Sequence, residues 1–107
     1  IFGCDICQQV CPWNRLSLPP DPAFEPKIPL PVLISDLTLS PVEFNQRFKK
    51  SPIKRAKRRG YLRNLSVAIG NKCDEKNIPI LKQAIQDDEP LVKSHAQWAI
   101  KKINLHK

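Results

Sequence analysis

The distribution of proline sets the strongest limit on the fold, because it differs sharply between the two halves of the chain. Eleven of the 107 residues are proline, and nine of them lie within the first 52 positions. Proline fixes φ and has no backbone N–H to donate, so residues 16–32 cannot form a regular helix or a central strand. We therefore predict that residues 16–39 are a proline-rich linker that lies extended over a surface, with Phe24, Ile28 and Leu30 as its apolar anchors.

Ahead of the linker, three of the four cysteines lie within eight residues. Cys4, Cys7 and Cys11 follow the spacing C-x2-C-x3-C, and Pro12 comes directly after them. The bacterial ferredoxin run C-x2-C-x2-C-x3-C-P ends in the same way, and its thiolates ligate iron–sulfur clusters. The spacing thus predicts that the three cysteines ligate 4Fe–4S clusters, and that residues 1–15 form the C-terminal end of a ferredoxin-like domain.

One ligand is missing from this pattern, because the position three before Cys4 is Ile1. A 4Fe–4S cluster normally takes four protein ligands. The remaining cysteine, Cys73, is far along the chain, and we expect it to be an unligated thiol. We therefore expect the chain to be the C-terminal piece of a longer protein that carries the other cluster cysteines, with Trp13 packed as a hydrophobic cover over the cluster region.

Zinc and disulfide bonds are the alternatives to an iron–sulfur site. Structural zinc favours four cysteines, or two cysteines with two histidines, but His95 and His106 lie at the far end of the chain. Four cysteines in a short chain also allow two disulfide bonds, although their close clustering and the lack of a recognisable signal peptide argue against a secreted protein. Both alternatives stay open at this point.

Positive charge is concentrated in the middle of the chain, whose net charge is +8. Ten basic residues and no acidic residue lie between Phe44 and Cys73: Arg47, Lys49, Lys50, Lys54, Arg55, Lys57, Arg58, Arg59, Arg63 and Lys72. Such a field attracts polyanions, and RNA is the expected partner. The alternative is that these basic residues form a solvated helix face without a partner, but a mixture of positive and negative side chains serves solubility better. An anionic membrane surface is disfavoured as the partner, because a helix on such a surface would also need a large apolar face with aromatic anchors.

The second half of the chain carries the start signals of two helices. Ser40, Pro41 and Glu43 form a capping box with proline at the first helical position, which predicts a helix over 41–49. The apolar residues that it would bury are Val42, Phe44 and Phe48. The pair Ser51-Pro52 repeats this signal, and Gly70-Asn71 is able to adopt the positive φ of a helix end. A second helix is therefore predicted over 52–69, with a kink or a close backbone approach at Gly60.

Both the apolar and the basic residues of this second helix recur at helical spacing. Its apolar face comprises Ile53, Ala56, Tyr61, Leu65, Ala68 and Ile69. The basic residues crowd its first two turns, where like charges repel at i,i+4. Phosphate is the simplest ligand that would account for this arrangement.

The last third of the chain has the pattern of a helical hairpin. A first helix carries Ile78, Leu81 and Ile85 on one face, and Asp88 is the predicted N-cap of a second. The apolar residues of the second helix are Leu91, Val92, Ala96, Ala99, Ile100 and Ile103. The pattern resembles a HEAT-type repeat, which buries its face only against a neighbour, here the helix over 61–69. The predicted fold is mainly α, with residues 40–107 as a HEAT-like helical domain with a basic face.

Two segments carry a resemblance to a known family. They are Cys-Asp-x-Cys-Gln-x-x-Cys-Pro-x-Asn, at 4–14, and Ile-Lys-Arg-Ala-Lys-Arg-Arg-Gly, at 53–60. Together with the proline-rich linker and the helical end of the chain, they resemble the C-terminal part of epoxyqueuosine reductase. The resemblance covers residues 1–103, which is nearly the whole chain.

The resemblance implies an oxidoreductase that reduces epoxyqueuosine to queuosine in tRNA, as a cytoplasmic monomer with no membrane association. The full-length protein would hold two 4Fe–4S clusters and a cobalamin bound by an N-terminal part. Here Cys4 and Cys7 would serve one cluster and Cys11 the other. The tRNA phosphates would be held by Lys54, Arg55, Lys57, Arg58, Arg59 and Arg63. No catalytic residue is predicted in this stretch. The chain departs from the family pattern in lacking the first cysteine motif.

The alternative function belongs to a different class. The chain would be a basic helical-repeat module that binds RNA or protein without redox chemistry and carries a metal-binding cysteine knuckle. Metal identity separates the two hypotheses, because iron with inorganic sulfide favours the reductase and zinc alone favours the binding module.

Overall fold

The computed structural model describes residues 4–16, 19, 21–24 and 34–107 of the chain. These residues form helices and no β-strand, which confirms the prediction of a mainly α fold. None of the helices in this described part has the length and apolarity to cross a membrane. In chain order the elements, with the short 3-10 helices marked η, are α1 (Ile6–Val10), η1 (Pro12–Leu16), η2 (Pro22–Phe24), η3 (Asp36–Thr38), α3 (Pro41–Arg47), η4 (Pro52–Ala56), α4 (Lys57–Lys72), η5 (Glu75–Asn77), α5 (Ile78–Ile85) and α6 (Pro90–Leu105).

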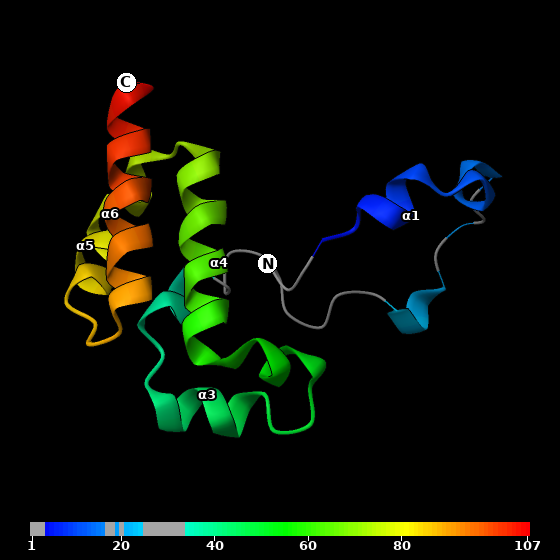
Figure 1. The fold of residues 1–107 in the computed structure, drawn as a ribbon, viewed down its shortest axis with the longest axis horizontal. Coiled ribbons are helices and arrows are strands. Elements are labelled where there is room, and N and C mark those ends of the chain that lie inside the picture. The colour runs from blue at the N-terminus through cyan, green and yellow to red at the C-terminus, as the bar shows by residue number, and fades with distance from the viewer. Residues whose placement is uncertain (1–3, 17–18, 20, 25–33) are drawn as a thin grey trace.

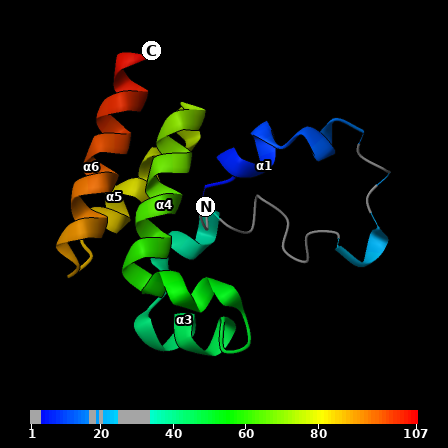
Figure 2. The ribbon, with the colours of Figure 1, turned by 45° about the vertical axis from the view of Figure 1, so that its right-hand side comes forward.

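Three helices, α4, α5 and α6, make up the main helical body (Figure 1). Both α4 and α5 pack against α6. The helices α4 and α6 run in the same direction, and α5 runs back between them along the chain (Figures 1 and 2). The buried apolar core consists of Leu37, Phe44, Phe48, Tyr61, Leu62, Leu65, Ile69, Leu81, Ala84, Val92, Ala96, Ala99 and Ile103. The predicted packing of the hairpin against a preceding helix is thus confirmed, while its assignment to the HEAT type stays a prediction.

The capping box predicted at the start of α3 is confirmed. The backbone N–H of Glu43 donates to Ser40 Oγ at 3.2 Å, and the N–H of Ser40 donates to Glu43 Oε2 at 2.9 Å. The helix ends at Arg47, two residues before the predicted end. The predicted burial of Val42 is wrong, because this residue is exposed. It lies two residues before the buried Phe44, and such a spacing puts two side chains on opposite sides of a helix.

A buried polar network lies beside an aromatic cluster where α3 meets α4. The ring centroids of Phe44 and Phe48 lie 5.8 and 5.0 Å from that of Tyr61. The hydroxyl of Tyr61 donates to Asp36 Oδ2 at 2.9 Å, and Arg47 forms an ion pair with the other carboxylate oxygen. Asp36 is 1% exposed, so these bonds replace its contacts with water. Burial, followed by the bond to Asp36, raises the pKa of Tyr61 well above its ordinary value.

The predicted single helix over 52–69 is wrong, because this segment divides into η4 and α4. Ser51 Oγ accepts the N–H of Ile53 at 3.3 Å and so caps η4. The chain then turns at Lys57, whose φ of 59° lies in the left-handed region. This turn interrupts the helical hydrogen bonds, which the spacing of the apolar residues does not reveal. Beyond it, α4 continues through Gly60.

Gly70 lies inside α4, so the predicted helix end at this position is also wrong. The helix continues to Lys72 and ends at Cys73, which adopts left-handed backbone angles (φ 53°, ψ 35°). A Cβ atom at Gly70 would come within 2.9 Å of Trp98 Cζ3 and 3.0 Å of the Cα atom of Ala99. Glycine is therefore required here by the close approach of α4 and α6 rather than by a turn.

The turn between α5 and α6 is organised by Asp87 rather than by the predicted Asp88. Asp87 Oδ1 accepts the backbone N–H of Glu89 at 2.9 Å, and Glu89 occupies the N-cap position of α6 without a side-chain capping bond. Asp88 is exposed. The predicted apolar faces are largely confirmed by the buried residues of the two helices, which are Leu81, Ala84, Val92, Ala96, Ala99 and Ile103.

Candidate functional site

The three clustered cysteines lie along the short helical segment at the start of the described chain. Cys4 precedes α1, Cys7 lies within it, and Cys11 follows it as C-cap in an extended conformation. All three are free thiols, and Cys4 and Cys7 are exposed while Cys11 is half-buried. In the described residues, no three His, Cys, Asp or Glu side chains are close enough together to hold a metal ion. Cluster ligation therefore stays a prediction.

The polar residues of the cysteine segment hold its backbone in place. Asn14 Nδ2 donates to the carbonyl oxygen of Gln8 at 2.7 Å and to its side-chain oxygen at 3.1 Å. Gln9 Nε2 donates to Asp5 Oδ1 at 2.9 Å. The bonds of Asn14 connect η1 back to α1 on either side of Cys11, whereas the bond of Gln9 connects α1 to its own N-cap residue. The spacing of residues in the sequence predicts no such role for them, although three of them belong to the motif that carries the family resemblance.

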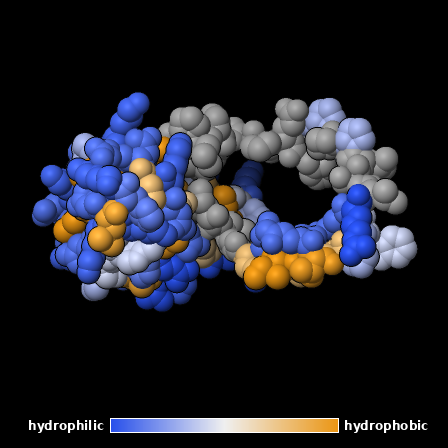
Figure 3. All heavy atoms as spheres, turned by 90° about the horizontal axis from the view of Figure 1, so that it is seen from above, coloured by the Kyte–Doolittle hydropathy of each residue, from blue (hydrophilic) through white to orange (hydrophobic). Residues whose placement is uncertain are grey.

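The cysteine segment also exposes apolar side chains. Ile6 and Val10 are both largely exposed, and Trp13 is 90% exposed. Figure 3 shows hydrophobic atoms gathered in a band along one side of this segment. The expectation that Trp13 covers the cysteine region is therefore not met in this structure.

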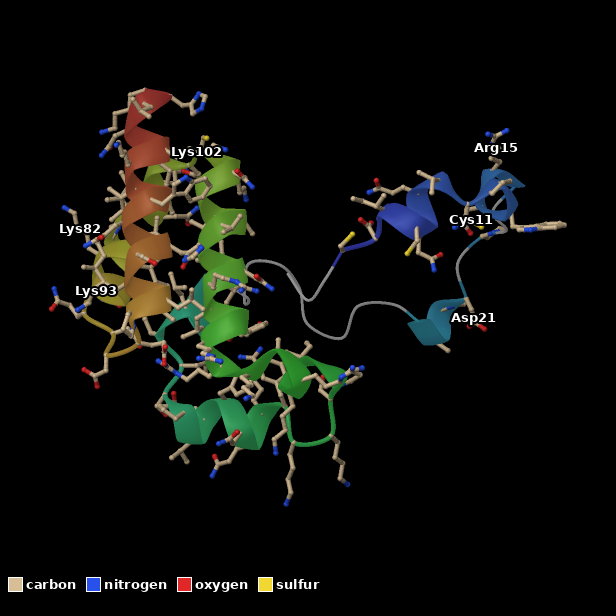
Figure 4. The ribbon with its side chains drawn as sticks, viewed as in Figure 1. Cys11, Arg15, Asp21, Lys82, Lys93 and Lys102 are labelled. Carbon is tan, nitrogen blue, oxygen red and sulfur yellow. The ribbon has the colours of Figure 1, made fainter. Side chains whose placement is uncertain are left out.

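The basic residues predicted to bind RNA are distributed over η4 and the first half of α4. Lys54, Arg55, Lys57 and Arg59 are exposed, whereas Arg58 and Arg63 are half-buried. Nitrogen-tipped side chains also extend into solvent from the loop between α3 and α4 (Figure 4), where Lys49 and Lys50 are exposed. The exposed charges thus form a basic edge, defined here as Lys49, Lys50, Lys54, Arg55, Lys57 and Arg59.

Arg58 differs from its neighbours because its guanidinium group is engaged inside the protein. Its Nε donates to the carbonyl oxygen of Leu39 at 2.7 Å, and both terminal nitrogens contact the carboxylate of Asp87, one of them at 3.2 Å. The hydrogen bond from Arg58 is the main cause that lowers the pKa of Asp87. Arg58 therefore joins the start of α4 to the α5–α6 turn and to the loop before α3, and it is not part of the basic edge.

The other residues singled out in the sequence lie outside these two surfaces. Cys73 is half-buried at the end of α4, where its thiol donates to the carbonyl oxygen of Gly70 at 3.3 Å. His95 is also half-buried, and its Nδ1 lies 2.8 Å from the carbonyl oxygen of Leu91. Both residues have a local structural partner.

These features define a helical chain that carries a segment rich in free thiols and an exposed basic edge. Comparison with known proteins identifies relatives that are named epoxyqueuosine reductase. The chain is 38% identical over 103 residues to the protein of Escherichia coli (strain K12). The aligned region covers 94% of this chain and 27% of the relative. It is 39% identical over 108 residues to the protein of Pseudomonas aeruginosa, and this aligned region covers 95% of the chain and 29% of the relative.

A third relative, from Xanthomonas campestris, is 36% identical over 104 residues and carries the same name. The predicted resemblance to epoxyqueuosine reductase is thus confirmed. The chain spans little more than a quarter of the length of these relatives. No protein-family model and no solved structure matches the chain.

Proposed function

We propose that this chain is the C-terminal part of an epoxyqueuosine reductase, a cytoplasmic oxidoreductase that converts epoxyqueuosine to queuosine in tRNA. The observation that carries the proposal is the similarity to proteins of that name over 94% of the chain. A match of this extent necessarily includes the basic segment in the middle of the sequence. In this proposal the chain supplies cluster ligands and a surface that holds tRNA, and the cobalamin and the catalytic residues belong to other parts of the enzyme.

The cysteines fit an iron–sulfur cluster in the chemistry of their donors. Thiolates are the soft ligands that such clusters take, and Cys4, Cys7 and Cys11 are free and accessible to solvent. Cys4 and Cys7 would bind one cluster and Cys11 the other, with the remaining ligands from outside this sequence. Bound clusters would supply one-electron transfer. The bonds of Asn14 and Gln9 would keep the segment in one conformation while its thiolates bind.

The cluster assignment predicts how combined cysteine substitutions behave in the full-length protein, purified without oxygen. Cys4→Ser and Cys7→Ser are each expected to remove one cluster, and the double variant should lose no more iron than either single variant. Combining Cys4→Ser with Cys11→Ser should lose more. Iron and acid-labile sulfide are the quantities to measure, with Cys73→Ser as the control that retains both. Zinc without sulfide in the unsubstituted protein would contradict the assignment and favour the binding module.

The basic edge would hold tRNA through phosphate contacts, together with Arg63. Several cations lie within a few turns of chain, and no acidic residue interrupts them between Phe44 and Cys73. Contacts of this kind fix the position of the RNA without reading its sequence, and helical RNA is recognised mostly by shape and backbone. The modified base would then be read by other parts of the enzyme.

The double variant Arg55→Gln/Arg59→Gln is expected to weaken tRNA binding and to flatten its dependence on salt. Each arginine that neutralises a phosphate contributes about one to the slope of log K against log salt concentration, so the slope should fall by about two. Lys82→Gln/Lys93→Gln is the matched control, because it removes the same charge from exposed positions on the side of the body away from η4 (Figure 4). An equal decrease in the control would show that overall charge, and not the basic edge, governs binding.

A further inference from the structure

Trp98 occupies an unusual place on the outer surface of α6. It is 41% exposed, although tryptophan is a large apolar residue. One edge of its indole ring lies against α4 at Gly70, where even a Cβ atom would come within 2.9 Å of Cζ3. The ring is therefore held in place by the backbone of a neighbouring helix while a large part of it stays open to solvent.

Two shallow hollows on the protein surface share Trp98 as a wall. The first lies between α4 and α6 and is lined by Val67, Ser94, His95 and Trp98. The second lies further along α6 and is lined by Trp98, Lys101, Lys102, Leu105 and His106. Each hollow thus combines the indole with polar groups, and one of them contains two lysines.

The surroundings of Trp98 are positively charged. The helix α6 contains three lysines and no acidic residue. Lys102 Nζ lies 5.1 Å from the centroid of the Trp98 ring, and it donates to Asn71 Oδ1 at 2.6 Å. The helix α4 contains no acidic residue either. The acidic residues nearest to it in the sequence follow its end, and one of these, Glu75, forms an ion pair with Lys107 at 3.9 Å. The site therefore suits a ligand with negative charge and a flat ring.

The Trp98 site is continuous with the basic residues at the start of α4. Arg59, Arg63, Val67 and Gly70 follow one another at spacings of four, four and three, so they lie along one side of α4. The distance from Arg59 to Gly70 along the helix axis is about 16 Å. Arginine side chains thus lead along α4 from the basic edge to the hollow that Val67 shares with Trp98.

We propose that Trp98 is a stacking platform for an unpaired base of the RNA whose phosphates contact Arg59 and Arg63. The proposal rests on the RNA surface proposed above and adds a preference for unpaired nucleotides. Aromatic side chains stack on any base, whereas a base inside a duplex offers no free face. Lys101 and Lys102 contact the phosphates that flank the stacked base. The test must distinguish this proposal from the binding of a second copy of the chain, or of another protein, at Trp98.

The test uses the fluorescence of Trp98 in the full chain. These 107 residues contain two tryptophans, so within them Trp13→Phe leaves Trp98 as the sole indole. A single-stranded RNA oligonucleotide and a blunt duplex of the same length are titrated separately. We expect the single strand to quench the emission and the duplex to leave it unchanged. Trp98→Leu, which keeps an apolar side chain against Gly70, should weaken single-strand binding at least about fivefold, and Trp98→Phe should retain part of the affinity.

The outcomes separate this proposal from the one on which it rests. If neither RNA binds at any salt concentration, the RNA surface itself is wrong and the stacking proposal falls with it. If RNA binds with the expected salt dependence but the emission and the Trp98→Leu affinity are unchanged, the stacking proposal alone is overturned. Sedimentation that shows RNA-free dimers, absent in Trp98→Leu, would overturn it in favour of an interface between copies.

Discussion

The substitution Asp36→Ala is expected to lower the free energy of unfolding by about 2–4 kcal/mol, because a buried hydroxyl and a guanidinium group whose side chain is only 29% exposed both lose their partner. Asp36 is 1% exposed and binds both Arg47 and the hydroxyl of Tyr61. Its removal leaves a buried hydroxyl and a guanidinium group without their partner. Small domains are stable by only about 5–15 kcal/mol, so much of the stability of the helical body would be lost.

Urea unfolding followed by circular dichroism measures this loss. Tyr61→Phe removes only the hydroxyl and keeps the ion pair with Arg47, so it should cost about 1 kcal/mol. Asp88→Ala removes an exposed carboxylate and should change stability by less than about 0.5 kcal/mol. If Asp36→Ala were no worse than Asp88→Ala, the network would contribute nothing to stability.

The same network predicts an alkaline titration of Tyr61, the only tyrosine among these 107 residues. Burial and the bond to Asp36 raise its pKa in the folded state. Tyr61 therefore contributes stability below the ordinary tyrosine pKa of about 10, and this contribution declines as the pH rises above that value. Ultraviolet absorbance of phenolate should appear only together with unfolding, and Tyr61→Phe should remove this part of the pH dependence.

The sequence predicted the features that depend on neighbouring residues. The capping box at Ser40 and Glu43 is complete within four residues, so its start signal was sufficient to place α3. The apolar spacing in α6 likewise predicted which residues face the core. Local patterns gave wrong predictions where a residue far along the chain determines the local structure. Gly70 has the pattern of a helix end in the sequence, but the ring of Trp98, 28 residues further on, explains why it is glycine.

The candidate site divides in the same way. The spacing of the cysteines and the concentration of positive charge are visible in the sequence, and they led to the resemblance that the comparisons confirm. The sequence does not show that Arg58 has a structural role while Arg59 is exposed on the basic edge. The two are neighbours with the same chemistry, and only the position of Asp87, 29 residues beyond Arg58, turns one into a structural residue. The exposure of Trp98 likewise gave no signal in the sequence, because it depends on how α6 packs against α4.

This difference leads to the second prediction with a large effect. Arg58→Ala is expected to lower the free energy of unfolding by about 2–3 kcal/mol, because it leaves the carboxylate of Asp87 and the carbonyl of Leu39 without their donor in a mostly buried place. Arg59→Ala is the matched control. It removes an exposed side chain of the same type, and should leave stability within about 0.5 kcal/mol of the unsubstituted protein.

The order of the two variants should reverse when RNA binding is measured under conditions where both are folded, so that Arg59→Ala has the larger effect. Arg59→Ala should weaken binding and reduce the slope of its salt dependence by about one, because one phosphate is no longer neutralised. Arg58→Ala should bind RNA as the unsubstituted protein does. Equal decreases of affinity in both variants would return Arg58 to the RNA surface, and equal decreases of stability would contradict its structural role.

Acid should remove the same ion pair without any substitution. The hydrogen bond from Arg58 lowers the pKa of Asp87 against the opposing effect of burial, with smaller contributions from the N–H of Glu89 and the charge of Lys93. A carboxyl group whose pKa is lowered by folding stabilises the protein above its unfolded pKa of about 4, and this contribution disappears as the pH falls below it. Asp87→Asn should therefore be less stable than the unsubstituted protein at neutral pH and lose less stability on acidification. Urea unfolding at a series of pH values measures both effects, and parallel curves for the two proteins would exclude the pair as a source of acid sensitivity.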